Sequence, residues 1–339
     1  MTFDWTAFAP AAAATFDGSE VRCFSDAAAE RALAAAGETV IAPLTHLGVI
    51  SCLGEDAKAF LHNQLTSDIN HLGHGQAQHS AWCTAKGRMI ASLVVLRTDA
   101  GYLLQLSADV LPGVLKRLQM FVLRSKVKLT DSSGNHALLG LAGREATAAL
   151  SAAGLPVPTA ALAVAEFHSG RVLRLADERF EIIVAVDAVA EIWTALTRTA
   201  RPVGTPVWRW LDVRAGVPLI TARTQEEFVP QMTNIDRLGG VSFHKGCYPG
   251  QEIVARTQYL GKVKRHLYRV TGPATLSAGD TLYSNTEPDH ACGMIVIGAP
   301  APEGNGEALA VLLENVLAGP VHVGARDGVA LSSIQPVAV

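Results

Sequence analysis

The run K-G-C-Y-P-G-Q-E at residues 245–252 constrains the local fold of this chain more than any other stretch. Pro249 presets φ at the second position of a turn, and Gly250 can adopt the positive φ that a type II turn needs at the third. Residues 251–258 then carry a helical pattern that stops near Gly261. The sequence therefore predicts a tight loop, a turn and a two-turn helix, in that order.

The same run predicts a reactive cysteine. Cys247 lies between two glycines, two residues after Lys245 and just ahead of the predicted helix. A nearby cation and a helix N-terminus both favour the thiolate, which is the nucleophilic form of cysteine. The alternative is a small buried hydrophobe, the commoner role of a free cysteine. The polar, turn-forming surroundings favour the functional thiol, so Cys247 and Lys245 are the catalytic candidates.

Length and composition predict a protein of several parts. A chain of 339 residues exceeds the size at which one core usually keeps growing, so two or three packed subdomains are expected. Apolar residues make up 49% and charged residues 17%, which is ample material for a folded core. The net charge of -3 argues against a protein that coats nucleic acid through bulk charge.

The five cysteines are widely spaced, and none forms a C-x-x-C pair. This usage argues against a disulfide framework or a standard structural zinc site, and it indicates a reducing compartment. The N-terminus has no basic segment before an apolar run, and no apolar run approaches the ~20 residues needed to span a bilayer. We expect a cytoplasmic protein with no membrane partner.

Hydrophobic patterning divides the chain into three regions. Residues 1–20 are expected to form a flexible arm, and residues 21–268 mix helical and strand patterns. Short strands separated by turn signals follow from residue 262 onward, a pattern typical of a small barrel, which we place at residues 269–339. The predicted class is α+β. The clearest expected helices cover residues 57–65, 108–121 and 188–200, and the clearest strands cover 45–53, 78–84, 89–97 and 102–106.

Two weaker clusters leave alternatives open. Four histidines lie close in sequence, but their spacing matches no standard zinc pattern, so polar loop residues are expected and no metal site is predicted. The basic residues of segment 256–269 are either a solvated strand face or an RNA contact. The histidines are His62, His71, His74 and His79, and the basic residues are Arg256, Lys262, Lys264, Arg265, His266 and Arg269.

Four blocks of the sequence resemble one known family. The run at 245–252 resembles the K-G-C-Y-x-G-Q-E signature of the folate-binding YgfZ-like proteins, relatives of the aminomethyltransferase (T-protein, GcvT) of the glycine cleavage system. Residues 60–68 resemble the family's F-L-x-x-Q-x-T-x-D helix and loop, and residues 83–89 its C-x-A-K-G-K/R-M hairpin. Residues 214–218 and 228–234 resemble the run that leads into the signature.

The resemblance implies a GcvT/YgfZ-like body of three subdomains, with a mixed α/β folate-binding core and a C-terminal small β-barrel. It also implies tetrahydrofolate as ligand, and a role in assembling or maintaining iron–sulfur clusters in client enzymes, one of which thiomethylates tRNA. A pterin needs stacking and edge hydrogen bonds, and the glutamate tail needs cations. The implied folate contacts are Asn63, Gln64, Trp82, Gln231 and Asn234 for the pterin, Lys86, Arg88 and Arg214 for the tail, and Tyr248, Gln251 and Glu252 from the signature.

One departure from the aminomethyltransferase pattern affects the expected chemistry. Ala91 and Ser92 stand where those relatives carry an acidic pair, so the obvious general acid/base is missing. Ordinary aminomethyl transfer is therefore not expected. A folate-dependent one-carbon transferase and a tRNA-binding modification factor remain the two alternative functions.

Overall fold

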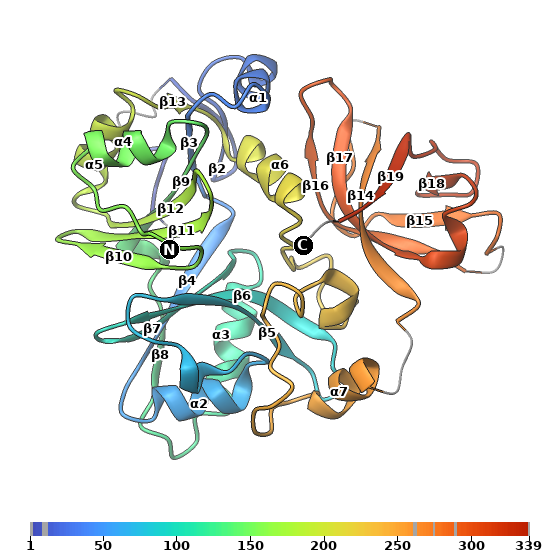
Figure 1. Cartoon of the computed structure of the whole chain (residues 1–339), viewed down its shortest axis with the longest axis horizontal. Helices are drawn as coiled ribbons and strands as arrows, with labels where there is room; N and C mark the ends of the chain where they lie inside the picture. The colour runs from blue at the N-terminus through green and yellow to red at the C-terminus, as the bar shows by residue number, and fades with distance from the viewer. Residues whose placement is uncertain (1–2, 9–12, 260–262, 274, 288–289, 338–339) are drawn as a thin grey trace. The chain divides into compact units, whose positions relative to one another are not determined.

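The computed structural model describes residues 3–8, 13–259, 263–273, 275–287 and 290–337. Within it the chain forms two compact units (Figure 1). The first unit comprises Met1–Ala57, Leu72–Gln78 and Val94–Trp208, and the second Lys58–His71, His79–Leu93 and Arg209–Val339. Gly261 and Lys262, which entered the sequence-based predictions, lie outside the described residues.

A six-stranded sheet forms the larger layer of the first unit, and it pairs antiparallel except where β13 runs parallel to β3. Helices α4 (Ala146–Ala152) and α5 (Val189–Leu196) contribute apolar side chains to the same core as this sheet, where Phe180 and Trp193 are buried. In spatial order the strands are β10 (Val164–Phe167), β11 (Gly170–Ala176), β12 (Arg179–Ala185), β9 (His136–Ala142), β3 (Val40–Pro43) and β13 (Arg201–Pro202).

A second sheet has five strands, and the predicted strand patterns at residues 45–53, 78–84, 89–97 and 102–106 account for four of them. Helix α3 (Leu111–Met120) buries Leu111, Val114 and Leu118, the face expected from its 3.6-residue pattern. In spatial order the strands are β5 (Ala77–Cys83), β6 (Met89–Thr98), β7 (Gly101–Ser107), β4 (Leu47–Leu53) and β8 (Lys128–Asp131).

Residues 3–8 pack against the core of the first unit through two aromatic side chains, which differs from the flexible arm expected for residues 1–20. Trp5 and Phe8 are buried, and the ring centroids of Trp5 and Trp193 lie 5.6 Å apart. Burying aromatic side chains of this size outweighs the conformational entropy that a free arm would keep.

The first hairpin and helix follow this segment. Strands β1 (Thr15–Asp17) and β2 (Glu20–Cys23) form the hairpin, and α1 (Ala27–Ala35) begins where the Asp26 side chain accepts a hydrogen bond of 2.8 Å from the Ala29 amide.

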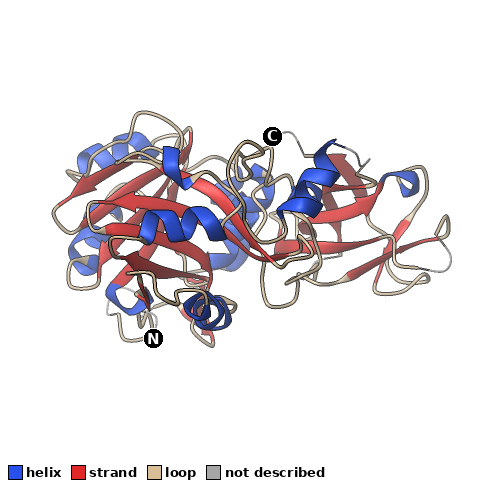
Figure 2. Ribbon diagram, turned by 90° about the horizontal axis from the view of Figure 1, so that it is seen from below, coloured by secondary structure: helices blue, strands red, loops and turns tan. Residues whose placement is uncertain are grey.

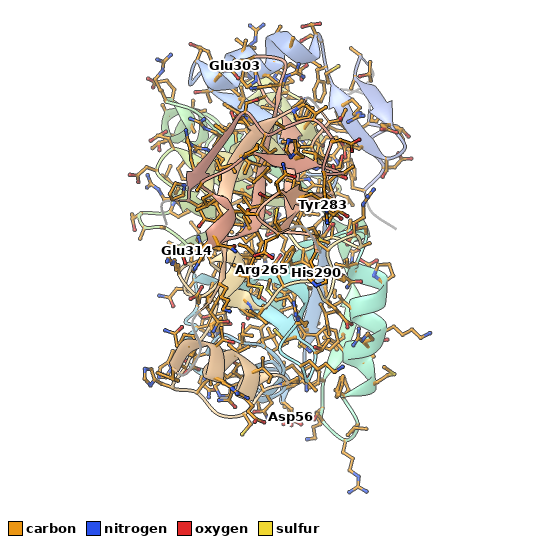
Figure 3. All side chains as sticks on the ribbon, turned by 90° about the vertical axis from the view of Figure 1, so that its right-hand side faces the viewer. Asp56, Arg265, Tyr283, His290, Glu303 and Glu314 are labelled. Atoms are coloured by element: carbon orange, nitrogen blue, oxygen red, sulfur yellow. The ribbon has the colours of Figure 1, made fainter. Side chains whose placement is uncertain are left out.

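The C-terminal residues form a six-stranded antiparallel sheet that curls into a half-barrel. The predicted small β structure is thus confirmed, as a half-barrel. Its core contains Val270, Ile295 and Leu312. In Figure 3 the labelled Arg265 and Glu314 mark where β14 begins and where β17 has ended. The strands, in spatial order, are β18 (Val321–Val323), β15 (Thr281–Ser284), β16 (Gly293–Pro300), β17 (Gly306–Leu313), β14 (Arg265–Gly272) and β19 (Ser333–Pro336).

Each unit combines strands with helices, so the predicted α+β class is confirmed (Figure 2). Across the described residues, every helix is too short or too polar to cross a bilayer. The domain limits drawn at residues 20 and 268 stay a prediction.

The remaining helices are α2 (Ala57–Gln64), α6 (Thr205–Ala215) and α7 (Gln251–Tyr259), with short 3₁₀ turns at Ile69–His71, Ser133–Asn135, Pro230–Thr233 and Glu314–Val316.

Candidate functional site

The candidate site is built on the loop that precedes α7 in the second unit. Cys247 is exposed in this loop, whereas the other four cysteines are buried. Burial raises the pKa of the Cys52 and Cys83 thiols to about 12 and that of Cys292 to about 11. Cys247 is therefore the accessible thiol of the chain, as the sequence predicted.

Lys245 is held away from solvent, two residues before this thiol. Its Nζ donates hydrogen bonds to the backbone carbonyls of His62, Leu65 and Ser67, the last two at 2.6 and 3.0 Å. Nζ also lies 5.1 Å from the centroid of the Tyr248 ring. Burial lowers the pKa of the Lys245 ammonium to about 8, an effect that the charge of Asp68 opposes.

This placement gives Lys245 three bonding partners that the sequence did not predict. Its three N–H donors are used at the C-terminal end of α2, where backbone carbonyls lack partners within the helix. The side chain thus joins residues 62–67 to the loop at 244–247. Both segments belong to the blocks that carried the family resemblance.

The turn before α7 packs directly on the hairpin between β5 and β6. Gly250 has φ +82°, as the predicted type II turn requires, and a β-carbon there would lie 2.4 Å from the carbonyl oxygen of Thr84. The same β-carbon would lie 2.6 Å from the Cα of Gly87. The two backbones touch because both positions lack side chains. Tyr248, buried in this turn, has its pKa raised by burial.

The hairpin is in turn joined to the segment before the loop. The amide of Met89 donates to the carbonyl of Phe228 at 2.8 Å, and the amide of Glu226 donates to the carbonyl of Met89 at 2.7 Å. The Gln231 Nε2 donates to the carbonyl of Val254 in α7 at 2.8 Å. Backbone contacts, together with the side chains of Lys245 and Gln231, therefore bring together the blocks at residues 60–68, 83–89, 228–234 and 245–252.

Two histidines share the carboxylate of Asp68 beside this loop. Asp68 Oδ1 lies 3.2 Å from His62 Nδ1, and Oδ2 lies 2.9 Å from His71 Nδ1. Burial and then the charge of Lys245 lower the pKa of the His62 imidazole. His62 Nε2 is also 3.9 Å from where a β-carbon on Gly246 would lie. In the described part of the chain, no three His, Cys, Asp or Glu side chains are arranged to hold a metal ion.

The residues predicted to contact a pterin differ in accessibility. Trp82 is 1% exposed, and its indole nitrogen donates to Gln64 Oε1 at 3.3 Å. Its ring is enclosed by protein, so it has no free face for the predicted stacking, and we correct that role to packing. Gln231 is 5% exposed, and its Oε1 has no hydrogen-bond partner among the described residues. Asn234 is buried, with φ +60°, and Asn63 is exposed.

The predicted cations lie at or near the surface. Lys86 is exposed, and the half-buried Arg88 donates through its guanidinium to the carbonyl of Glu227. Arg214 lies 5.7 Å from the Trp210 ring centroid and 3.6 Å from the carboxylate of Glu307. In α7, Gln251 is half-buried and Glu252 is exposed.

A folate would fit these groups in two respects. The unpaired, buried Oε1 of Gln231 is an acceptor for a pterin N–H, because a buried carbonyl without a partner is costly. Lys86 and Arg88 suit the carboxylates of a glutamate tail. The enclosed ring of Trp82 does not contribute, so aromatic stacking is the part of the predicted contact set that these residues do not supply.

Ala91 and Ser92, which stand where the aminomethyltransferases carry an acidic pair, contribute to the packing and hydrogen bonding of β6. Ser92 is buried in β6, and its Oγ accepts a hydrogen bond of 3.0 Å from the amide of Ile220. Ala91 beside it is fully buried. Neither side chain is a carboxylate, so this position supplies no acidic group for general acid or base catalysis.

Comparison with known proteins identifies the family. The GCVT N-terminal domain family matches residues 8–241. The chain is 35% identical over 224 residues to the tRNA-modifying protein YgfZ of Klebsiella pneumoniae, covering 66% of this chain and 68% of that protein. It is 35% identical over 238 residues to the protein of the same name in Colwellia psychrerythraea, covering 70% and 72%. For the Photorhabdus laumondii protein the identity is 37% over 240 residues, covering 69% and 72%.

A solved structure shares the complete fold. The glycine cleavage system aminomethyltransferase T from Bartonella henselae superposes with a TM-score of 0.80 over 100% of this chain and 97% of that chain, at 18% sequence identity. At this identity the match establishes the fold and carries no statement about activity.

Proposed function

This chain belongs to the YgfZ family and contains the GCVT N-terminal domain, and from that membership we propose that it acts in tRNA modification. The names of its relatives, tRNA-modifying protein YgfZ, support this level of function.

At the finer level, the protein is a folate-binding accessory factor that assembles or repairs iron–sulfur clusters in client enzymes, including one that thiomethylates tRNA. Cys247 is its reactive thiol. The observation that carries this proposal is the exposure of Cys247 on a loop fixed by backbone and ammonium contacts, while the other four thiols are buried. A thiol that is accessible and held in position suits a role in sulfur or metal handling.

The proposed ligand is tetrahydrofolate, which carries one-carbon units on its pterin and adjoining nitrogen atoms. Gln231 and Asn234 would face the pterin, and Lys86 and Arg88 the carboxylate tail. The remaining proposed contacts are Asn63, Gln64, Arg214, Tyr248, Gln251 and Glu252.

A one-carbon transferase is the first alternative. The apolar Ala91 and the hydrogen-bonded Ser92 count against it, because neither can serve as a general acid or base. A tRNA-binding factor is the second alternative. Arg256 is exposed in α7, but Arg265 and Arg269 donate to Ala291 O and Gln335 Oε1, so part of the basic segment has partners within the protein.

The proposed function is tested by substituting the thiol. In cells lacking their own copy, full-length Cys247→Ala is expected to remain folded and to lose support of tRNA methylthiolation, measured by mass spectrometry of hydrolysed tRNA. Cys52→Ala is the matched control, since Cys52 is a buried thiol in the other unit. Full methylthiolation with Cys247→Ala would reject the reactive-thiol role, and equal loss with both variants would show only general sensitivity to thiol removal.

A further inference from the structure

Three backbone carbonyls converge on one nitrogen in the second unit. They belong to His62 in the last turn of α2 and to Leu65 and Ser67 just beyond it, and we call these three oxygens the carbonyl site. The last carbonyls of a helix have no partner within the helix and lie at the negative end of its dipole. The donor, Lys245, comes from 178 to 183 residues further along the chain.

We propose that Lys245 is the positioning residue of the Cys247 loop, an internal ammonium ion that binds the carbonyl site and thereby fixes the thiol two residues away. This inference rests on the proposed function, because it treats Cys247 as the group that must be placed. It gives Lys245 a role through geometry, which differs from direct activation of the thiol by a neighbouring charge.

The chemistry of the carbonyl site matches an ammonium group. A lysine ammonium offers three N–H donors on one atom, which equals the three oxygens that surround it. An arginine presents its donors in a flat fork and cannot direct three of them from a single nitrogen. The buried charge is also 5.1 Å from the Tyr248 ring centroid, which adds a favourable cation–π contact inside the same loop.

Burial distinguishes Lys245 from the lysine of α2 itself. Lys245 is 9% exposed, whereas Lys58, which lies on α2, is exposed. A buried ammonium stays only where its donors are satisfied, because an unpaired buried charge is strongly unfavourable. Truncating Lys245 to alanine therefore leaves three oxygens directed at the volume that the ammonium group and its methylene chain had filled.

Such a site is expected to take a small ammonium ion from solution. In full-length Lys245→Ala, methylammonium chloride should raise the Tm in a saturable way, by on the order of 2 °C or more, because a ligand of the native state stabilises it. Tetramethylammonium is the matched ion, since it has the same charge and no N–H donor. The wild type and Lys58→Ala are the matched proteins and should respond equally to both ions. All samples are kept at one ionic strength.

Two results would overturn the inference. One is a Tm of Lys245→Ala equal to that of the wild type, and the other is stabilisation of Lys245→Ala by tetramethylammonium as strong as that by methylammonium. These readouts do not involve Cys247, so they test the carbonyl site even if the proposed function is wrong. They can be repeated in the double variant with Cys247→Ser.

A second variant covers the case in which Lys245→Ala does not fold. Lys245→Met fills the volume with an apolar chain of similar length, so methylammonium should not affect its Tm. Its support of tRNA methylthiolation is expected to fall at least about tenfold, the effect of losing a charged hydrogen bond. Lys245→Arg should not restore it. Wild-type methylthiolation by the folded Lys245→Met protein would show that the thiol needs no ammonium to be placed.

Discussion

The carbonyl oxygen of Thr84 lies only 2.4 Å from the point that a β-carbon on Gly250 would occupy, closer than real β-carbon contacts come. This contact closes the turn before α7 against the hairpin between β5 and β6. The hairpin and the Cys247 loop are therefore one structural feature, and the loop depends on a position with no side chain.

Gly250→Ala is expected to destabilise the protein by about 2 kcal/mol or more, because it adds a backbone clash to an unfavourable positive φ. Gly304→Ala is the matched control. Gly304 also has φ +82°, but nothing lies within 4 Å of the added β-carbon. Urea unfolding of both variants separates the two effects, since Gly304→Ala reports the φ strain alone. Equal losses of stability in the two variants would contradict the contact with Thr84.

The turn and α7 could be predicted from the sequence because their determinants are local. Pro249 and Gly250 specify the turn, and the predicted helix at 251–258 is observed as Gln251–Tyr259. The assignment of Cys247 as exposed followed from the same polar, turn-forming context. Rules of this kind act over a few residues, so one sequence is enough to apply them.

The partners of Lys245 and Trp5 could not be predicted in the same way. Lys245 binds backbone carbonyls, which every residue has, so no sequence pattern identifies them. Trp5 packs on Trp193, and only the folded chain brings these residues together. The burial of Trp82 could not be predicted for the same reason. The sequence pattern of a strand is the same whether a tryptophan ring in it has a free face or is covered by other residues.

Acid is expected to weaken the fold through His79. Burial lowers the pKa of its imidazole to about 4, whereas in the unfolded chain it is near the ordinary value of 6.5. The unfolded state therefore binds the proton first as pH falls, and the stability from this group is full above pH 6.5 and lost towards pH 4. Between pH 7 and pH 5 the loss is about 2 kcal/mol.

The measurement is urea unfolding at both pH values for wild type and His79→Gln. The variant should lose less stability than the wild type by about that amount. His71→Gln serves as the control, because the His71 side chain is 87% exposed. A wild-type loss that His79→Gln leaves unchanged would assign the acid sensitivity to other groups.

Removing the hydroxyl of Ser92 is expected to destabilise the protein by about 1–3 kcal/mol. The amide of Ile220 donates to this oxygen at 3.0 Å, and Ser92→Ala would leave the amide buried without a partner. Ser151→Ala is the control, because Ser151 is exposed and bonds only within its own helix, so its effect should stay within about 0.5 kcal/mol. Thermal or urea unfolding distinguishes them, and a neutral Ser92→Ala would leave this serine without a structural purpose.

Folate binding is expected to depend on the exposed cation of the hairpin. Lys86→Ala should weaken tetrahydrofolate about three- to tenfold, since a surface charge pair is worth about 1 kcal/mol, and the loss should shrink at high salt. Titration calorimetry under anaerobic conditions gives the affinities at two ionic strengths. Lys58→Ala is the matched control, an exposed lysine on α2 that is no part of the proposed contact set. If both lysine variants bind as the wild type does, the tail is held elsewhere. If the wild type does not bind at all, the folate proposal itself is wrong, and the effect of Cys247→Ala on tRNA methylthiolation must then be explained without a pterin.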